Sequence, residues 1–89
     1  MNRESTVTPN QYKLSKVGGE TMVSSDIMSN ILIVNEFGAE ILEVILKQKC
    51  ITIDSIVSKF NEIYQAESLE SDIMDFIGEM EKNEVILIL

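Results

Sequence analysis

The chain has 89 residues and a formal net charge of −8, and hydrophobic residues make up 45% of it. This length fits one domain, and the hydrophobic content is too high for a disordered chain. There is no histidine and a single cysteine, Cys50, which excludes an internal disulfide, a Cys/His zinc site and the commonest general base near neutral pH. No signal sequence and no membrane-spanning run is recognisable, so a cytoplasmic protein is expected.

Composition divides the chain unevenly. Residues 1–10 are polar and are expected to form a flexible tail ahead of one folded domain, residues 11–89. The charges of residues 1–35 sum to zero, whereas residues 36–89 hold four lysines against twelve acids. Such a surface repels nucleic-acid phosphates and suits a partner that carries lysine or arginine.

Three strands are predicted in the first half. Tyr12–Val17 alternates apolar and polar residues, as a half-buried strand does. Gly18 and Gly19 permit the positive φ angles of a tight hairpin turn, and Glu20–Ser25 follows as the second strand. Asn30–Val34 is the third strand. Together these segments predict a three-stranded antiparallel sheet.

Two helices are predicted next. Asn35 is a good N-cap for a helix over Glu36–Lys47, and Thr52 caps a second helix over Ile53–Tyr64. Apolar residues recur in both at the spacing of a buried helical face. Gly38 is expected to allow a neighbouring backbone to approach closely, because glycine is otherwise unfavourable inside a helix.

A third helix is predicted over Leu69–Lys82, with Ser68 as its cap and a left-handed stop at Asn83. Val85–Leu89 is apolar and is expected to form a short strand or to pack on the core. The fold class is therefore α+β and winged-helix-like, a three-stranded antiparallel sheet followed by three helices (βββααα).

The sequence contains little that indicates catalysis. Asp72, Asp75 and Glu79 lie one turn apart on the third helix, a spacing that suits a divalent cation or acid–base chemistry. A solvated face, or contact with a basic partner, explains these acids better. We therefore expect no enzyme activity, no metal and no cofactor. The same acidic helix argues against nucleic-acid contact.

The third strand and third helix suggest a binding site. If that strand lies at a sheet edge, its outer N–H and C=O groups are unpaired, and an extended peptide can add to them as a further strand. The third helix carries an apolar stripe that can serve as core, as groove floor, or as both: Ile73, Phe76, Ile77 and Met80.

The sequence resembles the PqqD-like family, whose members are RiPP recognition elements. Residues 33–42, which include Ile33-Val34-Asn35-Glu36 and Gly38-Ala39-Glu40-Ile41-Leu42, are similar to the family's turn from strand into helix. The capped second helix from Ile51 to Tyr64 and the segment from Leu69 to Ile86 are similar to its later elements. The resemblance covers about residues 12–88.

The resemblance implies a peptide chaperone. Such domains bind the leader segment of a ribosomally made precursor peptide and present the peptide to a modifying enzyme, such as a radical-SAM enzyme or a leader peptidase. The leader adds to the third strand and packs on the third helix. Carried over by position, the binding residues are Asn30, Ile31, Leu32, Ile33, Asp72, Ile73, Phe76, Ile77 and Met80.

Two alternatives to leader binding stay open. One is a winged-helix DNA-binding regulator, and the other is a generic protein–protein adaptor or dimerisation module in which Val85–Leu89 pairs across a two-fold axis. We expect a monomer or a weak homodimer.

Overall fold

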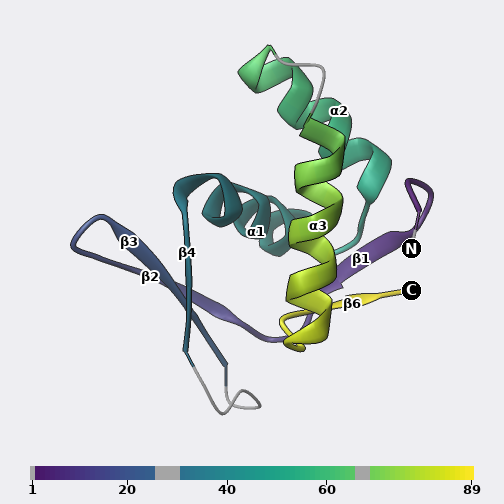
Figure 1. The fold of residues 1–89 in the computed structure, drawn as a ribbon. Coiled ribbons are helices and arrows are strands. Elements are labelled where there is room, and N and C mark those ends of the chain that lie inside the picture. Colours follow the sequence, from purple (N-terminus) through teal and green to yellow (C-terminus); the bar gives the residue numbers. More distant parts are fainter. Residues whose placement is uncertain (1, 26–30, 66–68) are drawn as a thin grey trace.

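The computed structural model describes residues 2–25, 31–65 and 69–89. It contains two small antiparallel sheets with helix α1 (Glu36–Gln48) between them and helix α3 (Leu69–Lys82) crossing in front, as Figure 1 shows. Helix α2 (Ile53–Tyr64) packs beside α3. None of the helices in the described ranges is long and apolar enough to cross a membrane.

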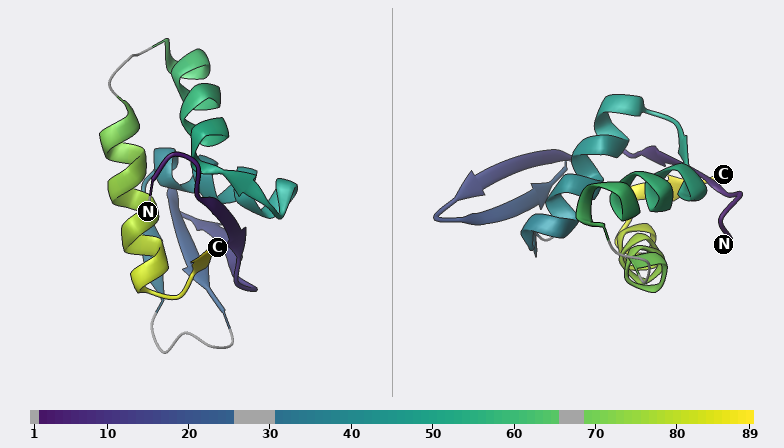
Figure 2. Two further views of the ribbon diagram at one scale, coloured as in Figure 1. Left: turned by 90° about the vertical axis from the view of Figure 1, so that its right-hand side faces the viewer. Right: turned by 90° about the horizontal axis from the view of Figure 1, so that it is seen from above.

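The first sheet confirms the predicted meander. Strands β2 (Lys13–Val17), β3 (Glu20–Ser24) and β4 (Leu32–Val34) lie in the order β2-β3-β4. Gly18 and Gly19 have φ angles of 60° and 85° and make the expected hairpin turn. The tip of this hairpin points away from the helices in Figures 1 and 2. A three-stranded sheet followed by three helices is therefore confirmed.

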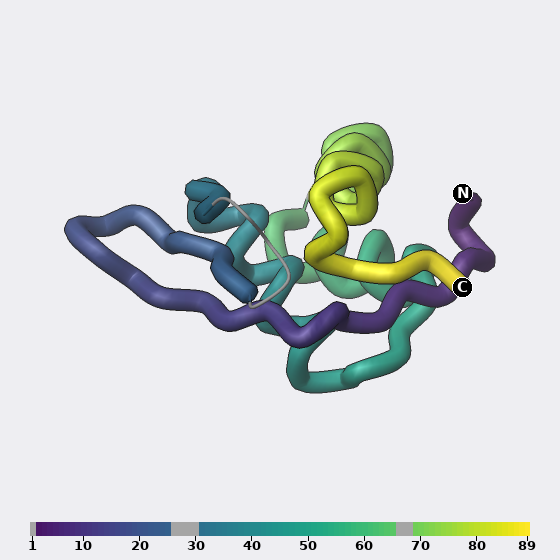
Figure 3. Tube along the Cα trace, turned by 90° about the horizontal axis from the view of Figure 1, so that it is seen from below, coloured from purple at the N-terminus to yellow at the C-terminus, as the bar shows by residue number. Residues whose placement is uncertain are grey.

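The second sheet was not predicted. Strand β1 (Thr6–Pro9) lies between β5 (Ile51–Thr52) and β6 (Ile86–Ile88), and Figure 3 shows β6 running beside β1. These four residues belong to the segment expected to be a flexible tail. The segment is ordered because it pairs with β5 and β6 and because Val7, its one large apolar side chain, is buried, with 0% of its surface exposed.

The helix starts agree with their caps. The Asn35 side-chain oxygen accepts a hydrogen bond from the Gly38 N–H at 2.8 Å, and the Thr52 hydroxyl accepts one from the Ser55 N–H at 3.2 Å. Each bond satisfies a backbone donor that the first helical turn leaves unpaired. The predicted cap Ser68 lies outside the described residues.

The end of α3 differs by one residue from the prediction. The left-handed conformation expected at Asn83 occurs at Glu84, whose φ is 64°. Asn83 instead donates from its backbone N–H and its side-chain amide to the Glu79 carbonyl, at 3.1 and 2.9 Å. Asn83 therefore continues the helical hydrogen bonding, and the chain reverses immediately afterwards into β6.

Candidate functional site

Strand β4 lies at an edge of its sheet. In the described part of the chain it pairs with β3 on one side and with no strand on the other. Its side chains alternate, with Val34 buried and Leu32 half-buried toward the core, while Ile31 and Ile33 are 61% and 63% exposed. An apolar edge with unpaired backbone groups accepts an additional strand readily.

A pocket opens where β4 runs into α1. We call it the Phe76 pocket. Asn35 and Phe37 line it from the β4–α1 junction, and α3 completes it with Leu69, Asp72, Asp75 and Phe76. Figure 3 shows β4 and α3 on the same side of the molecule. Asn35 directly follows β4 in the chain, so the free edge leads into the pocket.

Gly38 sets the position of the aromatic wall of this pocket. A Cβ atom at Gly38 would lie 2.6 Å from Cε1 and 2.9 Å from Cζ of Phe76. Such distances are far below van der Waals contact, so the ring occupies space that any side chain at position 38 would need. The prediction of a neighbouring backbone at Gly38 is therefore wrong, because the group that approaches closely is the Phe76 side chain.

The apolar stripe of α3 divides between core and pocket. Ile73 and Ile77 are 0% exposed and Met80 is 6% exposed, so all three pack in the core. Phe76 is half-buried and lines the pocket together with exposed Asp72.

On the strand side, the predicted residues Leu32 and Ile33 belong to the free edge of β4, and Ile31 directly precedes it. Asn30, the remaining predicted residue, lies outside the described residues. Of the nine predicted positions, Ile31, Leu32, Ile33, Asp72 and Phe76 therefore lie at the edge and pocket.

The pocket has an acidic rim. Within the described ranges the ion pairs are those of Arg3 with Asp54 at 2.7 Å and with Glu70 at 3.1 Å. No lysine or arginine of these ranges lies within 4.0 Å of Asp72 or Asp75. The rim therefore presents negative charge beside an apolar surface. In the same described ranges, no three histidine, cysteine or acidic side chains gather to hold a metal ion.

Phe37, Leu69 and Asn35 line the pocket without having been predicted to do so. Phe37 does not lie on the buried face of α1. This position was the available indication in the sequence that its ring makes another contact. It meets the Phe60 and Tyr64 rings edge-to-face, each at 5.6 Å between centroids. The Tyr64 hydroxyl donates to the Glu40 carboxylate, and this bond raises the pKa of Tyr64.

The structure is thus a small α+β domain with a free strand edge beside a pocket. The chain belongs to the family of coenzyme PQQ synthesis protein D (PqqD), whose family model matches residues 20–86. This match confirms the resemblance found in the sequence. Comparisons with curated proteins and with solved structures gave no match.

Proposed function

We propose that this protein is a non-catalytic recognition element that binds the leader segment of a ribosomally synthesised precursor peptide and presents it to a modifying enzyme. The enzyme is a radical-SAM enzyme or a leader peptidase. The observation that carries the proposal is the free edge of β4, where exposed Ile31 and Ile33 lead into the Phe76 pocket. Membership of the PqqD family supports a peptide-binding role in biosynthesis.

The leader adds to β4 as the fourth strand of the sheet. Each new backbone hydrogen bond contributes about 1 kcal/mol net. Every second leader side chain lies on the same face of the sheet as Ile33 and as Met22, the residue of β3 that pairs with Ile33. A leader residue beyond Val34 enters the Phe76 pocket, where an apolar side chain is stabilised by Phe37, Leu69 and Phe76.

The buried residues of the α3 stripe support the site without contacting the leader. Ile73, Ile77 and Met80 hold α3 at its distance from β4 and therefore set the width of the site, while Phe76 and Asp72 contact the leader. A lysine or arginine of the leader next to its apolar residue pairs with Asp72 or Asp75, because neither carboxylate has a cation of the described residues within 4.0 Å.

The charge of α3 disfavours the DNA-binding alternative. A helix that enters the major groove carries basic side chains toward the phosphates. The acidic residues of α3 outnumber its single lysine, Lys82, and comprise Glu70, Asp72, Asp75, Glu79 and Glu81.

Strand addition is tested with N-methylated leader peptides. The probe is the synthetic leader of a candidate precursor peptide chosen from the open reading frames that neighbour this protein's gene, with one backbone amide methylated at a time, and binding is measured by calorimetry. Because one edge of a strand uses alternate N–H groups, methylation should weaken binding about tenfold or more at every second position and little between them. Equal sensitivity at all positions would contradict strand addition.

The location of the site is tested with a pair of exposed residues in one sheet. Ile33→Glu should weaken leader binding about tenfold, because it places a charge against the apolar leader face. Val17→Glu is the matched control, since Val17 is 59% exposed on β2, away from the β4 edge. Equal loss in both variants, or amide shifts that miss residues 31–35 and 69–76, would reject the site.

A further inference from the structure

The hairpin that joins β2 to β3 determines which backbone groups of β4 are free. Its loop has two residues, Gly18 and Gly19, whose φ angles of 60° and 85° are those of a type I′ turn. Such a turn closes with a hydrogen bond between the residues that flank it, so Val17 and Glu20 form a hydrogen-bonded pair. Hydrogen-bonded and non-hydrogen-bonded pairs then alternate along the two strands.

This alternation carries over to the pairing of β3 with β4. The next hydrogen-bonded pair after the one that flanks the turn is Ser15 with Met22. The backbone N–H and C=O of Met22 therefore point toward β2. Those of Thr21 and Val23 point toward β4, because successive residues of a strand turn these groups to opposite sides.

The middle residue of β4 is left free. Val34 lies opposite Thr21 and is bonded to it. Leu32 lies opposite Val23 and is bonded in the same way. Ile33 belongs to the non-hydrogen-bonded pair between them, so its N–H and its C=O both point to the outer edge, where the described part of the chain places no strand. Ile33 is therefore the residue of β4 that offers both groups to an added strand.

The side chains of β4 divide between the two faces of the sheet. Val34 is buried and Leu32 is half-buried against the core, on the inner face where α1 packs. Ile33 is exposed on the outer face. A strand added beside β4 therefore turns every second side chain toward the helices and the others toward solvent.

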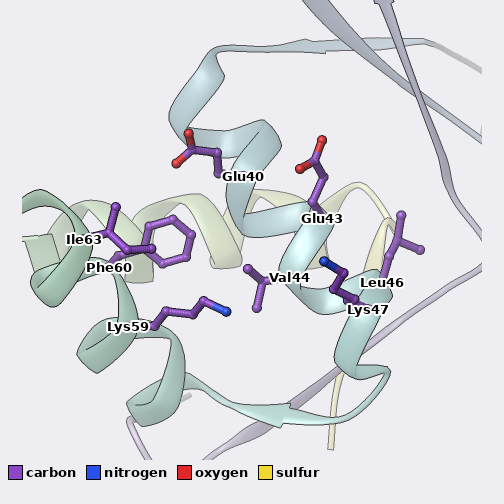
Figure 4. Close-up of a pocket in the computed structure, with 8 residues that line it drawn as sticks. All are labelled: Glu40, Glu43, Val44, Leu46, Lys47, Lys59, Phe60 and Ile63. Atoms are coloured by element: carbon purple, nitrogen blue, oxygen red, sulfur yellow. The ribbon is translucent and has the colours of Figure 1, made fainter.

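The pocket that adjoins β4 is the Phe76 pocket, which begins at Asn35 and Phe37. The pocket drawn in Figure 4 is lined by residues of α1 and α2 and shares none of them with the Phe76 pocket. The inner side chains of an added strand are therefore received at the Phe76 pocket.

An added strand is expected to run antiparallel to β4, because both pairings of this sheet are antiparallel and such pairing is slightly more stable per residue. The added residue opposite Ile33 then exchanges two hydrogen bonds with it and places its side chain on the outer face. Its two neighbours lie opposite Leu32 and Val34 and point to the inner face. The neighbour opposite Val34 lies next to the Phe76 pocket.

We propose that the backbone of Ile33 anchors one leader residue and that the site selects the two side chains on either side of that residue. This inference rests on the proposed function and specifies the class of leader: a segment with apolar side chains at two positions separated by one. Two adjacent apolar residues cannot fill both inner positions, because successive side chains point to opposite faces.

The register is tested first in the free protein by amide hydrogen exchange followed by NMR. Relative to an unfolded peptide, the Ile33 amide should be protected at least about tenfold less than the Val34 amide, and saturation with the synthetic leader peptide should then protect Ile33. Protection of Ile33 in the free protein, or its absence at Val34, overturns the register.

The anchor is tested with Ile33→Pro, which removes the free N–H. A strand edge accepts proline where the N–H faces solvent, so this variant should keep its circular-dichroism spectrum. It should bind the leader about tenfold more weakly than the matched control Ile33→Ala, which loses the side chain alone. Equal binding by the two variants overturns the anchor. Unfolding of Ile33→Pro alone overturns it too, because the N–H would then be bonded to β3.

The class of leader is tested by replacing each leader residue with alanine and comparing the result with N-methylation. Alanine should weaken binding most, about tenfold, at positions that alternate with the methylation-sensitive ones. Coinciding positions overturn the proposal, because a parallel strand would place its bonded residue opposite Leu32. If no leader peptide binds, the proposed function is rejected, whereas the exchange rates of the free protein decide the register separately.

Discussion

The contact between Gly38 and Phe76 determines both how α3 packs on α1 and how the pocket is shaped. The missing side chain at position 38 lets the Phe76 ring lie against the first turn of α1, where it forms one wall of the pocket. Asn35 is part of the same contact, because its side-chain oxygen holds the Gly38 N–H and would lie 3.3 Å from an added Cβ. One residue without a side chain therefore sets the shape of the pocket.

We expect Gly38→Ala to weaken leader binding about tenfold while changing the free energy of unfolding by only about 1 kcal/mol. The added methyl group displaces the Phe76 ring, which is unfavourable, but alanine is about 1 kcal/mol better than glycine in a helix. Calorimetry and urea unfolding measure the two quantities. Ser58→Ala, at an exposed position of α2, is the control for helix propensity, and unchanged leader affinity in Gly38→Ala would contradict the role of the ring.

Tyr12 connects the sheet to α1 from within the core. Its side chain is 4% exposed, and its hydroxyl donates to the Leu42 carbonyl. Burial raises the pKa of Tyr12 above its ordinary value of 10.0. The folded protein therefore keeps this hydroxyl protonated at a pH where the unfolded chain releases the proton.

Stability should fall as pH rises above about 10, because there the unfolded state binds fewer protons than the folded state. Below that pH both states are protonated and the contribution of Tyr12 is fully present. Urea unfolding at increasing pH measures the slope. Tyr12→Phe should flatten it while losing the hydrogen bond to Leu42, and an unchanged slope in this variant would assign the alkaline effect to other groups.

At the scale of secondary-structure elements, β1 binds distant parts of the chain together. It pairs with β5 and β6, and the backbone around it accepts hydrogen bonds from the start of α2, from Ile53 to Ser5 at 3.0 Å and from Asp54 to Arg3 at 2.8 Å. The Arg3 side chain then reaches both α2 and α3 through Asp54 and Glu70. The first residues of the chain thus stabilise its last elements.

Deletion of residues 1–9 should lower the free energy of unfolding by roughly 3 kcal/mol or more, since it removes the central strand of a sheet and the buried Val7 side chain. Arg3→Ala should cost about 1 kcal/mol or less, because its ion pairs are exposed to solvent. Thermal unfolding followed by circular dichroism compares the two variants. Native stability in the deletion variant would show that β1 is dispensable.

The helices were predictable because each one has its own apolar period, and α1 and α2 also begin at the caps Asn35 and Thr52. Strands β1 and β5 were not, since Thr6–Pro9 and Ile51–Thr52 are too short for any period and form only by pairing with each other and with β6. The same limit applies to the site. A helical stripe identifies Ile73, Phe76 and Ile77 alike, and only the packing of Phe76 on Gly38 distinguishes the pocket residue from the core.

At the scale of the whole molecule, the candidate site is connected to the contact between α1 and α2. The Phe76 pocket includes Phe37, whose ring meets the buried Phe60 ring of α2 edge-to-face. The rim of this pocket is acidic, so a leader that carries lysine or arginine is directed to it.

The aromatic contacts around Tyr64 also give the protein an optical reporter. The chain has no tryptophan and two tyrosines, so its intrinsic emission arises from Tyr12 and Tyr64. Tyr64 touches Phe37 on one side, stacks on Phe60 at 6.2 Å between centroids, and is hydrogen-bonded to Glu40. Leader binding that shifts these neighbours alters tyrosine fluorescence, so binding can be followed on the unlabelled protein with leader peptides that lack tyrosine and tryptophan.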